Sequence, residues 1–108
     1  MARDMIVNFQ VMPHMDAIKD SLDGYLSDVG TEIKWSRNRW FVTLPGKPES
    51  MRHRPAAHEE RWFEVFIGTD SVDVITREAD EFTNVVAEGF AKRIARMLDG
   101  KMESEVLV

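Results

Sequence analysis

The sequence predicts an α+β domain in which two helices pack on a mostly antiparallel sheet of four or five strands. Short runs of alternating apolar and polar residues indicate strands, and two longer runs with apolar residues at helical spacing indicate helices. The connections between the central runs are too short for parallel crossovers, so neighbouring strands should pair antiparallel. The expected order is β-α-β-β-β-β-α, and 108 residues, 44% of them hydrophobic, suit a single core.

The first two elements are a strand over residues 5–12 and a helix over residues 13–29. The strand alternates apolar and polar residues, and Pro13 ends it because proline suits the first turn of a helix. The helix has one apolar stripe and a largely acidic opposite side, and Gly30 should end it. Gly24 inside it costs about 1 kcal/mol relative to alanine, which indicates close packing or a bend there.

Two hairpins are expected next. Residues 31–36 and 39–44 form the first, with Asn38 tolerating the positive φ of a tight turn. Residues 61–67 and 71–76 form the second, around a turn that begins with glycine.

Residues 45–60, between the hairpins, contain three prolines and no periodicity, which is typical of a long loop. A second helix with acidic residues at its start and basic residues at its end follows the last strand, and Gly100 should cap it. We therefore expect one domain over residues 1–100 and a flexible tail over residues 101–108. The alternating apolar residues within 105–108 also allow this segment to add as a strand to the sheet edge of a partner or of this chain. The expected apolar stripe of the second helix is Phe82, Val85, Val86, Gly89, Phe90, Ile94 and Met97.

Several functional classes are excluded by composition. The chain has no cysteine, so thiol nucleophiles, disulfides and cysteine-based zinc sites are absent. It has no signal-peptide pattern and no apolar run long enough to span a membrane, so we expect a cytoplasmic protein. It also lacks a nucleophile elbow, a phosphate-binding glycine-rich loop and a dinucleotide fingerprint, and we expect no cofactor and no metal.

Charge is distributed unevenly along the chain. The formal net charge is −5, yet the segment from Lys34 to Arg61 has seven basic residues against three acidic ones, and the rest of the chain carries −9. The basic residues of this segment are Lys34, Arg37, Arg39, Lys47, Arg52, Arg54 and Arg61.

The central strands have more apolar residues than one buried face requires. Two helices cover one face of such a sheet, so Trp62, Glu64 and Phe66, with Phe41 or Trp40 beside them, should lie on the other face. A face of this kind is typical of an interaction surface, and a homodimer is the commonest occupant. A long loop folded over the face, or a curled sheet, would also account for the pattern.

A second hypothesis is binding of single-stranded nucleic acid or phosphate. Arginine and lysine contact phosphates, and tryptophan rings stack on bases, so a mixed basic and aromatic hairpin has the required chemistry. The net negative charge opposes long-range attraction to a polyanion. The residues expected to take part are Lys34, Arg37, Arg39, Arg52 and Arg54.

A third hypothesis is hydrolytic or metal chemistry at His53 and His58 in the long loop. The two histidines are five residues apart in a proline-containing segment, a spacing that has no fixed ligand geometry. The leading hypothesis is therefore a non-enzymatic cytoplasmic interaction module that forms a homodimer through the aromatic sheet face.

Overall fold

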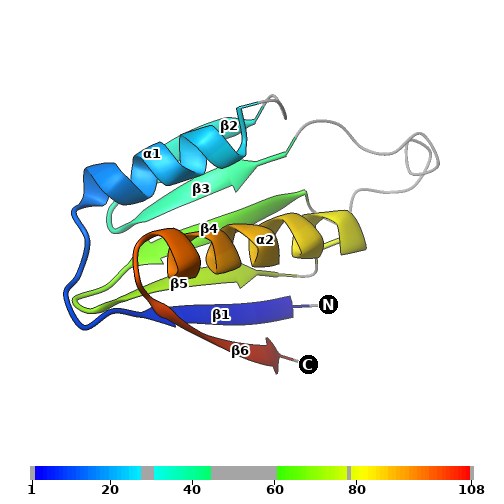
Figure 1. The fold of residues 1–108 in the computed structure, drawn as a ribbon. Helices are drawn as coiled ribbons and strands as arrows, with labels where there is room; N and C mark the ends of the chain where they lie inside the picture. Colours follow the sequence, from blue (N-terminus) through cyan, green and yellow to red (C-terminus); the bar gives the residue numbers. More distant parts are fainter. Residues whose placement is uncertain (1, 28–30, 45–60, 78, 108) are drawn as a thin grey trace, which may run out of the picture.

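The computed structural model describes residues 2–27, 31–44, 61–77 and 79–107, and it has one six-stranded sheet and two helices (Figure 1). Every neighbouring pair in the sheet is antiparallel, and the strand order is β2-β3-β4-β5-β1-β6. This confirms the predicted α+β class and the order of elements. The elements are β1 (Ala2–Asn8), α1 (Met15–Tyr25), β2 (Glu32–Ser36), β3 (Arg39–Thr43), β4 (Trp62–Ile67), β5 (Ser71–Thr76), α2 (Glu81–Met97) and β6 (Lys101–Leu107).

The sixth strand differs from the expected flexible tail. β6 pairs with β1 from Lys101 opposite Asn8 to Leu107 opposite Ala2. β5 occupies only one edge of β1, so the other edge has backbone N–H and C=O groups that the returning chain can satisfy. The sheet therefore has six strands, where four or five were expected from the sequence and strand addition was an alternative only for residues 105–108.

The turn from α2 into β6 also differs from the expectation that Gly100 caps the helix. Asp99 has the left-handed conformation, with φ of 60°, and the Gly100 N–H donates to the Ala95 carbonyl oxygen at 2.9 Å. This is the hydrogen-bond pattern of a Schellman cap, with Asp99 in the position that usually holds glycine. Gly100 is required for another reason, because a Cβ atom there would lie 2.6 Å from side-chain atoms of both Val7 and Phe9.

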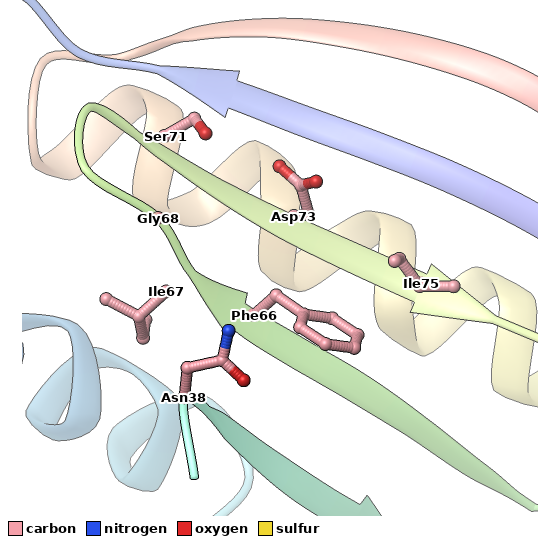
Figure 2. A pocket seen from close by; sticks show the side chains of 7 residues that line it. All are labelled: Asn38, Phe66, Ile67, Gly68, Ser71, Asp73 and Ile75. Atoms are coloured by element: carbon pink, nitrogen blue, oxygen red, sulfur yellow. The ribbon is translucent and has the colours of Figure 1, made fainter.

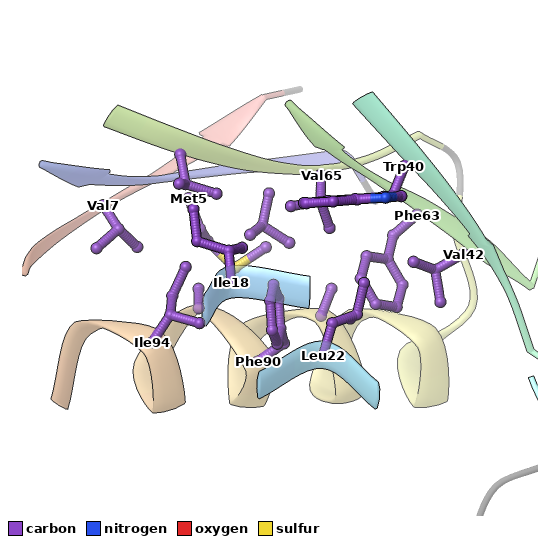
Figure 3. Close-up of a cluster of buried hydrophobic side chains, with 14 of the residues drawn as sticks. Met5, Val7, Ile18, Leu22, Trp40, Val42, Phe63, Val65, Phe90 and Ile94 are labelled. Carbon is purple, nitrogen blue, oxygen red and sulfur yellow. The ribbon is translucent and has the colours of Figure 1, made fainter. Parts of the chain in front are cut away.

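One hydrophobic core lies between the sheet and both helices (Figure 3). The two helices cover the same face of the sheet (Figure 1). Labelled side chains of β1, β3 and β4 point toward them (Figure 3), and alternate residues of β5 belong to the same cluster. The largest fully buried side chains of this core include Met5, Val7, Ile18, Leu22, Val42, Phe63, Val65, Phe90 and Ile94.

α2 is rotated relative to its predicted apolar stripe. Phe82, Val85 and Met97 are exposed, whereas the polar Asn84 is buried. Asn84 lies toward the sheet because its Oδ1 accepts a hydrogen bond from the Thr76 hydroxyl at 2.6 Å. Hydropathy cannot foresee this arrangement, since a buried amide is tolerated only where a partner satisfies it.

The contact between the helices depends on Gly89. The Tyr25 hydroxyl donates to the Val86 carbonyl oxygen at 3.0 Å, and a Cβ atom at position 89 would overlap that hydroxyl. Burial raises the pKa of Tyr25, although the charge of Arg93 partly opposes the increase. Gly24 has only an ordinary contact with Arg93, so close packing does not explain it. The predicted cap Gly30 lies outside the described residues.

Asp80 connects the start of β4 to the start of α2. One carboxylate oxygen caps the helix by accepting from the Thr83 N–H at 2.7 Å, and the other accepts from the Arg61 Nε–H at 2.9 Å. Burial raises the pKa of Asp80, but the hydrogen bonds from Thr83 and the hydrogen bond and charge of Arg61 outweigh it and hold the pKa below 3.8. The ends of the sheet and of α2 are thereby held together by a charge-assisted contact.

We predict opposite effects of substitutions at two adjacent positions in the α2–β6 turn. Gly100→Ala should lower the free energy of unfolding by about 1–3 kcal/mol, because the new methyl group overlaps Val7 and Phe9. Asp99→Gly should raise it by up to about 1 kcal/mol, because glycine relieves the left-handed strain. Urea denaturation of both variants checks this, and a Gly100→Ala protein as stable as the wild type would contradict the packing of this turn on β1.

Candidate functional site

The sheet face opposite the helices carries no described helix or strand, and we call it the open face (Figure 1). Successive side chains of a strand point to opposite sides, so the residues that alternate with the core residues lie here. The face crosses the whole sheet, and its centre lies on β3, β4, β5 and β1, the four inner strands. Its central side chains are Ile6, Arg39, Phe41, Trp62, Glu64, Phe66, Asp73 and Ile75.

The structure brings four of the five predicted interface residues together on this face. Phe41, Trp62, Glu64 and Phe66 lie on adjacent strands, with Phe41 directly opposite Glu64. Trp40 is only 5% exposed and lies in the core on the helix side. Of the two alternatives for β3, Phe41 is therefore the residue on the open face, and Trp40 is not part of it.

Aromatic rings and one guanidinium group are packed together at the centre of the open face. The rings of Phe41 and Trp62 have centroids 6.0 Å apart. The Arg39 guanidinium lies 4.7 Å from the Phe41 centroid and 5.0 Å from that of Phe66. Both distances are typical of cation–π contacts, so the guanidinium shields rings that no described element covers.

Glu64 is the only buried acidic residue in the described part of the chain. Its side chain is 4% exposed although it lies on the open face, because its neighbours surround it. Arg77 Nε donates to Oε2 at 3.1 Å, and Arg39 Nη1 lies 3.4 Å from Oε1. Two guanidinium groups therefore compensate one carboxylate, which gives Glu64 a structural role in holding the face together.

Two of the predicted anion-binding residues lie on the open face. Lys34 is directly opposite Phe41 on β2, next to Arg39 and the aromatic side chains. Each of the two also has an acidic partner, since Lys34 lies 3.1 Å from Glu32 and Arg39 contacts Glu64. The cations and rings thus share one surface, but part of the positive charge is neutralised within the chain.

The other predicted basic residues are elsewhere. Arg37 lies exposed in the β2–β3 turn, where it and not Asn38 has the positive φ, of 60°. The Asn38 carbonyl oxygen instead accepts from the Ile67 N–H at 2.8 Å, which ties this turn to β4. Arg52 and Arg54 lie outside the described residues.

The third hypothesis concerns His53 and His58, which also lie outside the described residues. Within the described part of the chain, no three histidine, aspartate or glutamate side chains are grouped so that they could hold a metal ion. The described helices include none that is long and apolar enough to cross a membrane.

A hollow of about 320 Å³ lies at the end of the open face where the hairpins turn (Figure 2). Asn38 comes from the β2–β3 turn, Phe66 from β4, and Ser71, Asp73 and Ile75 from β5. Burial raises the pKa of Asp73, and a hydrogen bond with Ser71 partly opposes that increase. Sequence patterns do not reveal this site, because Asp73 alternates with buried valines like any outward strand residue, and the hollow forms only where the two hairpins meet.

Comparisons with models of known protein families, with curated proteins and with solved structures found no match. Functional inference for this chain therefore depends on the chemistry of the open face itself.

We predict that neutralising Glu64 destabilises the protein. Glu64→Gln removes the charge that compensates Arg39 and Arg77, and should lower the free energy of unfolding by about 1–3 kcal/mol. Glu103→Gln, at an exposed position of β6, should change it by no more than about 0.5 kcal/mol. Urea denaturation at neutral pH measures both, and equal stability of the two variants would show that the Glu64 cluster is not structural.

Proposed function

We propose that the protein is a non-enzymatic interaction module that forms a homodimer through its open face. The observation that carries this proposal is the placement of Phe41, Trp62 and Phe66 together on a sheet face that no described helix or strand covers. Aromatic side chains are enriched in the buried centres of protein interfaces, where they contribute much of the binding energy.

The charges at the centre of the open face are compatible with burial in an interface. Covering an unpaired carboxylate would carry a large desolvation cost. Glu64 is already compensated by Arg39 and Arg77 from its own chain, so a partner can cover it without supplying a new cation. A carboxylate held in this way is also poorly placed to exchange protons with a substrate, which favours binding over catalysis.

The size of the face is adequate for self-association only if most of it is used. Six strands spaced about 4.8 Å apart and roughly 18 Å long span a plane of about 24 by 18 Å. A specific interface buries about 800 Å² of accessible surface on each partner, so the side-chain relief of nearly the whole sheet must contribute. Two such sheets would pack face to face about 10 Å apart around a two-fold axis.

We predict a dimer of twice the 12.5 kDa chain mass, and monomers when the aromatic centre is made polar. Trp62→Gln and Phe66→Gln should dissociate the dimer while circular dichroism shows an unchanged fold, because neither side chain belongs to the core cluster. Val85→Gln, at an exposed position of α2, should leave the molar mass unchanged. Light scattering on a size-exclusion column measures all four proteins, and a monomeric wild type would refute self-association.

A second candidate function is supported by one observation, the location of Lys34 and Arg39 beside the rings of Phe41 and Phe66. Cations for phosphates and rings for bases are the two requirements for binding single-stranded nucleic acid. The partial neutralisation of both cations by acidic partners makes this candidate weaker than the dimer.

This candidate predicts that a labelled oligothymidylate binds at low ionic strength and that its affinity falls steeply as salt rises. Lys34→Glu should weaken binding, whereas Lys92→Glu on α2, on the other side of the sheet, should not. Fluorescence anisotropy measures this, and the absence of binding at low salt would eliminate the candidate.

A further inference from the structure

We propose that the hollow at the turn end of the open face binds a small organic cation, an ammonium group on an apolar body, with Asp73 as its counter-ion. The hollow has a volume of about 320 Å³, near the lower end of the range for small-molecule sites. It is open to solvent on the open face and is assembled from two hairpins (Figure 2).

Asp73 supplies the charge for this site. Its carboxylate is half-buried, and among the described residues no lysine, arginine or histidine nitrogen lies within ion-pair distance of it. A carboxylate removed from water in this way is stabilised when a cation approaches, and the raised pKa of Asp73 agrees with a missing counter-charge.

The strand register shows which charged groups lie around Asp73. On the β4 side its register neighbour is Phe66, and beyond it lies Arg39, which is already paired with Glu64. On the β1 side its neighbour is Ile6, with Asp4 diagonally placed on the same strand. Glu103 follows on β6, opposite Ile6, and Lys101 lies opposite Asn8, nearer the turn, so the charges on this side are of both signs and the Asp73 carboxylate itself selects a cation.

The other residues that line the hollow can contact the apolar body of the ligand and accept hydrogen bonds from its ammonium group. Phe66, Ile67 and Ile75 provide apolar surface, and an aromatic ring near a carboxylate also attracts a cation. Asn38 and Ser71 provide a side-chain amide and a hydroxyl, whose oxygens can accept from ammonium hydrogens. A primary ammonium group has three such hydrogens, so a single carboxylate would leave others to be satisfied by these groups or by water.

The proposed dimer would cover this site, because that interface needs nearly the whole open face, but the site itself needs no partner. All its residues belong to one chain, and it lies at the turn end of β4, whereas Trp62 is at the opposite end of that strand. Trp62→Gln therefore provides a protein in which the dimer should be lost and the hollow retained. A monomeric wild type in light scattering would refute the dimer, whereas a lack of cation binding by Trp62→Gln would refute the binding site, so the two proposals can fail separately.

The experiment is an NMR titration of wild type and Trp62→Gln with phenethylammonium and with its uncharged analogue 2-phenylethanol. The charged probe should shift the amide signals of Asn38, Ser71 and Asp73 and should bind at least about tenfold more tightly than the neutral probe, because it adds a charge-assisted hydrogen bond. Asp73→Asn should weaken binding of the charged probe by at least about tenfold, whereas Asp70→Asn in the adjacent turn should leave it unchanged.

The stability of Asp73→Asn and the pH dependence of probe binding distinguish a binding role of Asp73 from a structural role. Because the native pKa of Asp73 is above its ordinary value of 3.8, its contribution to stability is greatest below that value and is lost as pH rises through the native pKa. Asp73→Asn should therefore be at least as stable as wild type at pH 7 while losing the charged probe, and wild-type binding should weaken as pH falls through that pKa. Equal binding of both probes, retained binding by Asp73→Asn, or no binding to either protein would overturn the proposal.

Discussion

The organisation of this protein follows from the covering of a six-stranded sheet by two helices on a single side. β3 and β4 have aromatic residues on both faces, so those of their side chains that point away from the helices must be accommodated without a covering element. These side chains pack against one another on the open face. Arg39 shields the rings of Phe41 and Phe66, and Glu64 is enclosed beneath two guanidinium groups.

This arrangement gives the open face two properties that rarely occur together on a solvent-exposed sheet. It is apolar enough to favour association, and its central charge is compensated within the chain, so covering it does not leave an unpaired ion. The strands also hold these side chains in fixed register, which limits the entropy lost on binding. Asp73 is the exception, since its carboxylate lies at the turn end of the same face without a cation from the described chain.

Sequence patterns predicted the class, the hairpins and most of the open face, because alternation within a strand decides which residues share a side. They left Phe41 and Trp40 as alternatives, since alternation alone does not say which side the helices take. They misplaced the buried side of α2, because the hydrogen bond between Asn84 and Thr76 depends on two elements meeting. They also assigned the helix cap to Gly100, although Asp99 occupies that position.

What the sequence by itself determined was local: strands and helices whose periodicity depends on neighbours a few residues apart. Only the tertiary structure decided that residues 101–107 form a strand, that Gly100 must lack a side chain, and that Asn38 meets Asp73 around a hollow. The physical reason is the same in each case. These features arise from contacts between segments far apart in the chain, such as Val7 with Gly100, and no short-range pattern encodes the register that brings them together.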